Sequence, residues 1–136
     1  MAKALLTSAT VAFFKRKPRV LLLDDDPSMQ RLVSALLRRE GYRVDVYLTG
    51  RDALRSIEIN DFDVLLLDLM MPHEGGMTVI RELGEKKPEL LARTLVISAS
   101  TQSIIGTVAD EVAGVVKKPF EARELIGAVR RVRGSK

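Results

Sequence analysis

Three short apolar runs constrain the fold of this sequence more than any other feature. They lie at residues 20–23 (Val-Leu-Leu-Leu), 64–67 (Val-Leu-Leu-Leu) and 95–97 (Leu-Val-Ile). None of them alternates with polar residues, as a strand with one face in water would do, so each is typical of a strand buried on both faces. Such strands occur in parallel sheets, whose crossover connections place helices over both faces.

Stretches with helical spacing separate the runs. Asp26 and Pro27 follow the first run and suit the cap and the first position of a helix. Apolar residues then recur every three or four positions, at Met29, Leu32, Val33, Leu36 and Leu37. Gly41 is expected to end that helix. Similar patterns predict strands at 43–47 and 115–116 and helices at 51–59, 77–86 and 121–133. Gly106 interrupts one further helix, expected over roughly 102–110.

Alternation of strands and helices predicts an α/β fold with a doubly wound, five-stranded parallel sheet. The expected strand order is 2-1-3-4-5, the flavodoxin-like arrangement, with helices on both faces. The domain is expected to cover residues 19–133. A basic and apolar extension, residues 1–18, precedes it, and a short tail, residues 134–136, follows.

Composition narrows the class of protein. A chain of 136 residues suits one domain. With no cysteine there is no disulfide framework, thiolate metal site or cysteine nucleophile. No apolar run reaches the roughly 20 residues that span a bilayer, and we expect a cytoplasmic protein.

The net charge of +4 is unevenly distributed. Residues 1–18 carry +4 and residues 123–136 carry another +4, which leaves −4 on the body of the chain. A basic balance often indicates a nucleic-acid partner, but here the basic residues lie at the ends. We therefore expect no direct nucleic-acid binding.

Polar residues follow four of the predicted strands directly. Residues 24–26 are all aspartate, Asp68 follows the run at 64–67, Ser98 follows the run at 95–97, and Lys117 and Lys118 follow the strand at 115–116. Ligands of open α/β sheets bind beyond the carboxyl ends of the strands, so these side chains are expected to converge. Clustered carboxylates repel one another unless a cation lies among them, and Mg²⁺ suits such oxygen ligands. A metal and a lysine beside a nucleophilic carboxylate favour phosphoryl chemistry.

Each residue taken alone has an ordinary explanation. Asp26 before Pro27 suits a helix cap, Asp68 a turn, Ser98 a strand end, and Lys118 a solvated surface. His73, the one histidine, is best explained as a solvated loop residue rather than as a metal ligand. The joint placement at one sheet edge is harder to explain in that way.

The sequence resembles the receiver domain of bacterial two-component response regulators over residues 19–133. Four segments carry the resemblance: Val-Leu-Leu-Leu-Asp-Asp-Asp-Pro at 20–27, Val-Leu-Leu-Leu-Asp-Leu-Met-Met-Pro at 64–72, Val-Ile-Ser-Ala at 96–99 and Val-Lys-Lys-Pro-Phe at 116–120. The resemblance implies that Asp68 is the phospho-acceptor. It also implies that Asp25, assisted by Asp24, binds Mg²⁺ together with Asp68 and the backbone carbonyl of Met70.

Further roles follow from the same resemblance. Lys118 would bridge to Asp68 and then to the phosphoryl group, Ser98 would be the switch hydroxyl, and the bond from Lys118 to Pro119 would be cis. The phosphoryl donor would be a histidine kinase or a phosphotransfer protein. The downstream protein target would bind the face formed by the elements at 102–110, 115–116 and 121–133. The domain would accept a phosphoryl group without being a turnover enzyme.

The sequence departs from the family's pattern in three places. Val115 stands where these domains commonly carry Tyr or Phe, so an aromatic readout of activation is not expected. The stretch from Ser98 to Lys118 is slightly short. Met70 and Ser100 occupy two variable positions that tune the lifetime of the phosphoryl group, and neither positions an attacking water. We expect slow self-dephosphorylation.

Two other functions stay open at this point. Asp24-Asp25-Asp26-Pro27-Ser28 also fits a haloacid-dehalogenase-type phosphatase with Asp24 as nucleophile and Asp26 as acid/base, although that leaves Asp68 unexplained. A receiver-like scaffold that works without phosphorylation is the second, and Val115 with the short switch region favours it.

The two ends of the chain also leave alternatives. Residues 4–14 are apolar and run into the basic cluster at 15–17. They are interpreted as a helix packed on this domain or on a second subunit, as an unstructured leader, or as an interfacial membrane contact. The C-terminal end predicts either a stand-alone receiver, in a monomer or homodimer, or one from which an output domain has been removed.

Overall fold

The computed structural model describes residues 17–72, 75–99 and 102–134. Five parallel strands form one sheet in the order β2-β1-β3-β4-β5, as expected from the sequence. The strands are β1 (Arg19–Leu23), β2 (Arg43–Tyr47), β3 (Val64–Asp68), β4 (Thr94–Ser98) and β5 (Gly114–Lys117).

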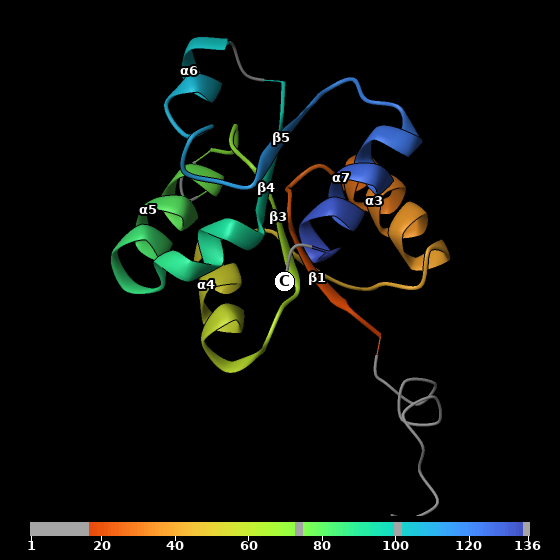
Figure 1. Cartoon of the computed structure of the whole chain (residues 1–136), viewed down its shortest axis with the longest axis horizontal. Helices are drawn as coiled ribbons and strands as arrows, with labels where there is room; N and C mark the ends of the chain where they lie inside the picture. Colours follow the sequence, from red (N-terminus) through yellow and green to blue (C-terminus); the bar gives the residue numbers. More distant parts are fainter. Residues whose placement is uncertain (1–16, 73–74, 100–101, 135–136) are drawn as a thin grey trace, which may run out of the picture.

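Helices cover both faces of this sheet (Figure 1). On one face lie α3 (Pro27–Arg39) and α7 (Ala122–Gly134); on the other lie α4 (Gly50–Ile59) and α5 (Gly76–Lys86). The remaining helical segments are the 3₁₀ helix η1 (Pro88–Arg93) and the short α6 (Gln102–Gly106). No helix in the described part of the chain is long and apolar enough to cross a membrane.

The apolar runs divide between two cores by the period of two that a strand imposes. In β1, Val20 and Leu22 pack into the core under α3 and α7, whereas Leu21 and Leu23 pack into the core under α4 and α5. All four side chains are buried. A run without polar alternation is therefore explained by helices on both sides of it.

The two ends of α3 follow from local chemistry. The Asp26 carboxylate accepts a hydrogen bond from the Ser28 backbone N–H, Pro27 occupies the first turn of α3, and Gly41 takes a positive φ of 93° after that helix.

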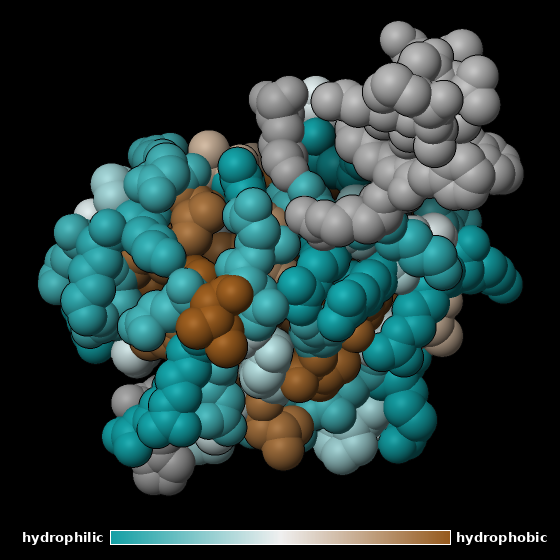
Figure 2. All heavy atoms as spheres, turned by 90° about the horizontal axis from the view of Figure 1, so that it is seen from below, coloured by the Kyte–Doolittle hydropathy of each residue, from teal (hydrophilic) through white to brown (hydrophobic). Residues whose placement is uncertain are grey.

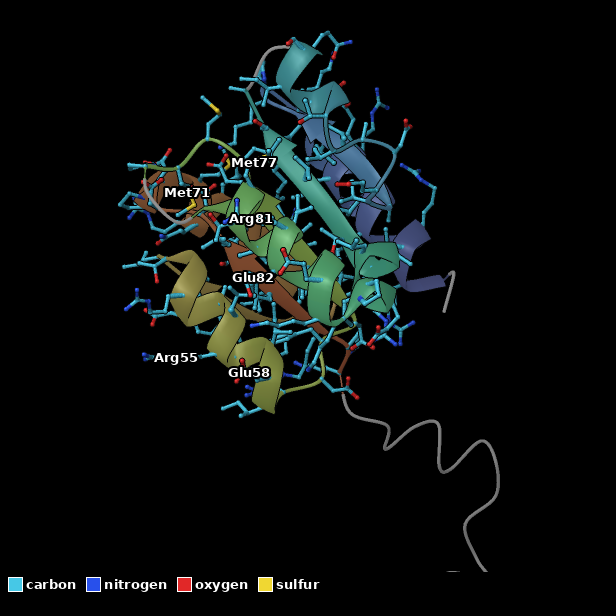
Figure 3. All side chains as sticks on the ribbon, turned by 90° about the vertical axis from the view of Figure 1, so that its left-hand side faces the viewer. Arg55, Glu58, Met71, Met77, Arg81 and Glu82 are labelled. Carbon is cyan, nitrogen blue, oxygen red and sulfur yellow. The ribbon has the colours of Figure 1, made fainter. Side chains whose placement is uncertain are left out.

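On the other side of the sheet, α4 and α5 pack against each other and present Arg55, Glu58 and other charged residues outward (Figure 3).

One prediction of secondary structure was wrong in extent, and one element was not predicted. The helix expected over 102–110 ends at Gly106, because glycine weakens a helix and turns replace it from there to β5. The 3₁₀ helix η1 was not expected from the sequence. Residues 1–16, with the apolar stretch and most of the basic cluster at 15–17, lie outside the described residues, as do His73 and Ser100.

Candidate phosphoryl-acceptor site

Three carboxylates meet at the carboxyl edge of the sheet. Asp24 follows β1 directly, Asp68 ends β3, and the two strands are hydrogen-bonded neighbours with Leu23 paired to Leu67. Each of Asp24, Asp25 and Asp68 offers a carboxylate oxygen that lies within 4.8 Å of those of the other two. The structure therefore brings together acids that are 43 or 44 positions apart in the sequence.

Lys118 supplies the positive charge. Its Nζ lies 3.4 Å from Asp68 Oδ2 and 3.6 Å from Asp24 Oδ2. The backbone N–H of Lys118 donates to the carbonyl of Ser98, and the peptide bond to Pro119 is cis, as the family resemblance implied. One ammonium thus faces two buried carboxylates, which leaves the cluster with an excess of negative charge.

Asp24 is the most constrained of the acids. Its side chain is fully buried, and Oδ1 accepts a hydrogen bond of 2.9 Å from the Asp26 backbone N–H. Its Oδ2 is buried and has no hydrogen-bond partner within the described ranges. Burial is the largest cause that raises the pKa of Asp24 above its usual value, and the hydrogen bond from Asp26 and the charge of Lys118 oppose it only in part.

An unsatisfied carboxylate oxygen is the observation that tests a metal site here. A buried carboxylate oxygen without a hydrogen bond is unfavourable unless enough positive charge lies beside it, and Lys118, 3.6 Å away, is shared with Asp68. Asp24 Oδ2, together with carboxylates of Asp25 and Asp68, is a set of hard oxygen donors, which Mg²⁺ prefers to nitrogen or sulfur ligands. The residues therefore fit a magnesium ion.

Asp68 is held by its surroundings, and its side chain is 8% exposed. Its Oδ1 accepts a hydrogen bond of 3.0 Å from the Met70 backbone N–H, and its Oδ2 faces Lys118. The Met70 side chain is 58% exposed beside it. The role of the Met70 carbonyl as a metal ligand stays a prediction.

Ser98 lies at the same edge, at the end of β4. Its side chain is buried, and in the sheet register it is opposite Lys117. Its position one strand beyond Asp68 agrees with the expected edge, whereas its role as a switch hydroxyl stays a prediction.

The site depends on two residues that the sequence reasoning missed. A Cβ atom at Gly76 would lie 2.5 Å from the backbone oxygen of Asp68, so only glycine lets α5 begin this close to the acceptor. The side chain of Gln30 donates a hydrogen bond of 2.6 Å to the carbonyl of Asp24. Two adjacent glycines after Pro72 were the available sequence signal for the first; no comparable signal marks Gln30.

Comparison with known proteins decides the family. Residues 20–130 match the family described as the response regulator receiver domain. The chain belongs to this family. Among curated proteins it is 31% identical over 112 residues to the transcriptional regulatory protein DltR of Streptococcus agalactiae, covering 82% of this chain and 50% of DltR. The chain spans about half the length of the curated relatives it matches first.

Solved receiver domains share the fold over nearly their whole length. The receiver domain of the Francisella response regulator 1452 superposes with a TM-score of 0.77 at 28% identity, covering 87% of this chain and 98% of that one. TrrA of Thermotoga maritima, solved in complex with Mg²⁺ and beryllofluoride, superposes with a TM-score of 0.76 at 27% identity. The match covers 85% of this chain and 98% of the TrrA chain.

The phosphatase alternative loses its support at Asp26. This residue is exposed, and its carboxylate caps α3 through the Ser28 N–H. It is absent from the group of three acids that offer mutually close oxygens, whereas Asp68, which that alternative left unexplained, is one of them.

Proposed function

We propose that this receiver domain is a phosphoryl-accepting switch in which Asp68 takes a phosphoryl group from a histidine kinase or a phosphotransfer protein. The single observation that carries the proposal is the arrangement of Lys118 Nζ between Asp68 and Asp24, with Asp24 Oδ2 left without a hydrogen bond. Such a cluster is unfavourable at rest and suits the arrival of further cations and of an anionic group held by them.

Transfer of the phosphoryl group forms one bond to phosphorus and breaks another. A carboxylate oxygen of Asp68 forms a bond to phosphorus while the bond from phosphorus to the donor's imidazole nitrogen breaks. The electron pair of that bond returns to the imidazole ring, and the product is an acyl phosphate. Lys118, 3.4 Å from Asp68 Oδ2, offsets negative charge on the transferring group. The domain is thereby modified once and does not turn over substrate as an enzyme.

Magnesium is the cofactor we infer for this site. Asp24, Asp25 and Asp68 would hold it, and the Met70 carbonyl is the fourth candidate ligand. When bound, it neutralises charge on the carboxylates and on the phosphoryl oxygens. The same ion would relieve the unfavourable burial of Asp24, whose pKa is raised by its surroundings.

The output is proposed to lie on the face formed by α6, β5 and α7, which meets the site through Ser98 and Lys118. Phosphorylation adds nearly two negative charges and three acceptor oxygens. The Ser98 hydroxyl would donate to one of them, and the loop after β4 would follow. Val115 offers no aromatic side chain for this readout, so the change of shape is assigned to α6, which has only 5 residues.

We expect the phosphoryl group to be lost slowly. Met70 follows the acceptor by two positions and carries an apolar, exposed side chain that positions no attacking water. Measurement of the acyl phosphate over time in purified protein tests this expectation. A half-life of seconds would contradict it.

A protein target for the output face follows from the proposal, and the place of action is proposed to be the cytoplasm. Curated relatives of about twice this length are named as transcriptional regulators. For this chain we propose action through protein contacts, because the basic residues lie at its ends and the body between them is acidic.

The test is intact-mass measurement after incubation with Mg²⁺ and acetyl phosphate. The wild-type chain should gain the mass of one phosphoryl group, and Asp68→Asn should gain none. Asp26→Asn is the matched control, because asparagine also caps helices well, and it should be labelled as the wild type is. Labelling of Asp68→Asn would refute the assignment. Absence of labelling in every protein would favour the scaffold that works without phosphorylation.

A further inference from the structure

A groove of about 410 Å³ lies at the end of the molecule opposite to the acidic cluster. It is bounded by the end of α4, by the loop from α4 to β3, and by η1. Apolar side chains form part of its walls, among them Ile57, Phe62, Leu65 and Leu90. Figure 2, a view onto this end, shows hydrophobic side chains exposed between hydrophilic ones.

Ile59 marks the rim of this groove. It is 81% exposed, the largest fraction among the exposed large hydrophobic residues of the described ranges. A single exposed isoleucine needs no explanation, but one that stands beside an apolar groove extends a surface suited to another apolar group.

Three acidic and two basic residues line the groove, which is an excess of one negative charge. Glu58, Asp61 and Glu89 are exposed carboxylates on its rim. Of the two basic residues there, Arg93 donates a hydrogen bond of 3.0 Å to the carbonyl of Phe62, which holds its guanidinium in place and leaves its charge unpaired by a carboxylate in the described part of the chain. Lys87 is the other. The rim therefore suits a basic segment.

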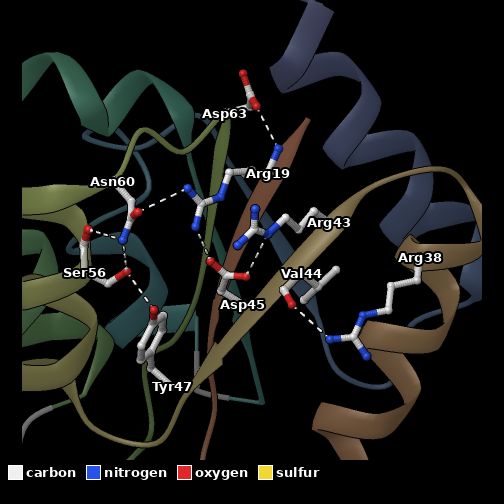
Figure 4. Close-up of polar contacts among 9 residues, drawn as sticks. All are labelled: Arg19, Arg38, Arg43, Val44, Asp45, Tyr47, Ser56, Asn60 and Asp63. Carbon is white, nitrogen blue, oxygen red and sulfur yellow. Dashed lines mark hydrogen bonds and ion pairs between the residues drawn. The ribbon is translucent and has the colours of Figure 1, made fainter. Parts of the chain in front are cut away.

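The chain enters the domain beside this groove. The Arg19 backbone N–H donates to Asp63 at 2.7 Å, and its guanidinium donates to the Asn60 side chain (Figure 4). The same guanidinium lies 4.9 Å from the centre of the Phe62 ring. Asn60 and Phe62 are themselves part of the groove wall. Lys17 and Pro18 thus lead into the sheet next to the groove.

We propose that residues 11–17 of this chain occupy the groove. Phe13 and Phe14 would fill its apolar part beside Ile59, and the bases at 15–17 would lie near the rim carboxylates. An extended chain covers about 3.3–3.6 Å per residue, so Phe14 reaches about 10 Å from Lys17. The segment lies outside the described residues; its sequence, its length and the charge of the groove carry the proposal, which is independent of phosphorylation at Asp68.

Two other occupants are less suited to the groove. In a symmetric dimer that uses the same groove on both copies, the carboxylates of one rim would meet those of the other. An anionic membrane surface would be repelled by the same carboxylates. The experiment below distinguishes these cases from the proposal.

The absence of native cysteine makes disulfide trapping a clean test. The full chain carrying Phe13→Cys and Ile59→Cys is equilibrated in dilute solution with reduced and oxidised glutathione, and the fraction with an internal disulfide is measured by mass. The matched control carries Phe13→Cys and Arg43→Cys. Arg43 is exposed, and its backbone N–H donates to the carbonyl of Pro18, so it lies beside the start of the domain but outside the groove.

The proposal expects an effective concentration of the thiols at least about tenfold higher for the pair at 13 and 59 than for the control. Equal values would overturn it. Disulfide-linked dimers that increase with protein concentration, without the internal bond, would overturn it in favour of a second copy. Co-sedimentation with phosphatidylglycerol vesicles, without the internal bond, would overturn it in favour of a membrane surface.

A second measurement avoids new thiols. Phe13→Asp combined with Phe14→Asp should speed amide hydrogen exchange in residues 57–62 and 88–93 at least about fivefold, because the groove would lose its apolar occupant. Exchange unchanged from that of the wild-type chain would contradict the proposal. Acetyl phosphate labelling of the same variant should be unchanged, which separates this inference from the function proposed for Asp68.

Discussion

The two edges of the parallel sheet each carry a cluster of charged side chains, and the clusters differ in balance. At the amino edge, the Arg19 guanidinium lies 2.6 Å from Asp45, which Arg43 also approaches at 3.6 Å (Figure 4). Asp63 accepts from the Arg19 backbone. Two cations there face two carboxylates. At the carboxyl edge, three carboxylates lie close together, and the ammonium of Lys118 pairs with two of them, Asp24 and Asp68.

At the amino edge, hydrogen bonds also connect the charged residues to neutral side chains. Arg19 uses both terminal nitrogens, toward Asp45 and Asn60, and stacks on Phe62, although its Nε has no hydrogen bond in the described part of the chain. Asn60 in turn bonds Ser56, whose hydroxyl accepts from Tyr47. The amino edge is thus a network that stabilises the fold. The carboxyl edge keeps an unsatisfied oxygen on Asp24 and an excess of negative charge.

The molecule gives up stability at the carboxyl edge. A buried cluster with more carboxylates than cations costs free energy of folding, and a protein keeps such a cluster where a ligand uses it. The comparison predicts that removal of a charge destabilises the domain at the amino edge and stabilises the ion-free domain at the carboxyl edge.

The largest expected effect is at the amino edge. Arg19→Ala should lower the free energy of unfolding by about 3 kcal/mol, because it leaves Asp45 and Asn60 without their main partner in a partly buried site. Urea unfolding followed by circular dichroism measures the change. The matched control is Arg43→Ala, which approaches the same carboxylate from an exposed position and should change stability little. Equal effects of the two variants would break the comparison.

Packing at the carboxyl edge is expected to be as strict as elsewhere. Gly76→Ala should cost about 2 kcal/mol in urea unfolding, because the new Cβ would meet the backbone of Asp68 at 2.5 Å. Gly84→Ala, in the same helix, would place its Cβ 3.9 Å from Leu91 and should stabilise the domain slightly. Stabilisation by both variants would contradict the close approach of α5 to the Asp68 backbone.

Removal of the charge of Asp24 should change the free energy of unfolding in the opposite direction to removal of the charge of Arg19. In the absence of divalent cations, Asp24→Asn should raise the free energy of unfolding by about 1 kcal/mol near neutral pH, since it removes a buried charge and keeps an oxygen to accept from Asp26. Asp26→Asn, at the exposed cap, should leave stability unchanged. Destabilisation by Asp24→Asn would show that the acidic cluster is already satisfied without an ion.

The smallest effect is on pH dependence. The pKa of Asp24 is raised in the folded domain above the unfolded value of 3.8, mainly by burial, so the folded state holds this proton to higher pH than the unfolded state does. Its contribution to stability is therefore present at low pH and is lost as the pH rises through the raised pKa. The difference in unfolding free energy between the wild type and Asp24→Asn should change in that direction, and a difference that is flat with pH would contradict the raised pKa.

Much of the fold could be predicted because it depends on local pattern. The runs at 20–23 and 64–67 predicted buried parallel strands, and the cap at Asp26 predicted where α3 begins. The helix at 102–110 was too long, because a pattern with Gly106 inside it does not say on which side the helix stops. The 3₁₀ helix η1 has no periodic apolar face to reveal it.

The site was predictable to the extent that strand ends determine it. Asp24, Asp68 and Lys118 follow strands that lie in one sheet, so their convergence follows from topology. The unsatisfied Asp24 Oδ2 and the close approach of Gly76 to the Asp68 backbone could not be predicted, because both depend on the exact separation of segments that a sequence pattern does not specify.

If the acids at the carboxyl edge are arranged for a cation, Mg²⁺ should stabilise the folded domain through Asp24. Urea unfolding of the wild-type domain and of Asp24→Asn is compared in chelator and in Mg²⁺ at ten times the dissociation constant measured for the wild type. Mg²⁺ that binds only the folded state at this concentration raises the free energy of unfolding by about 1.4 kcal/mol. We expect that gain for the wild type and little or none for Asp24→Asn. An equal gain in both proteins, or none in the wild type, would contradict the claim that the acids at this edge are arranged for a cation.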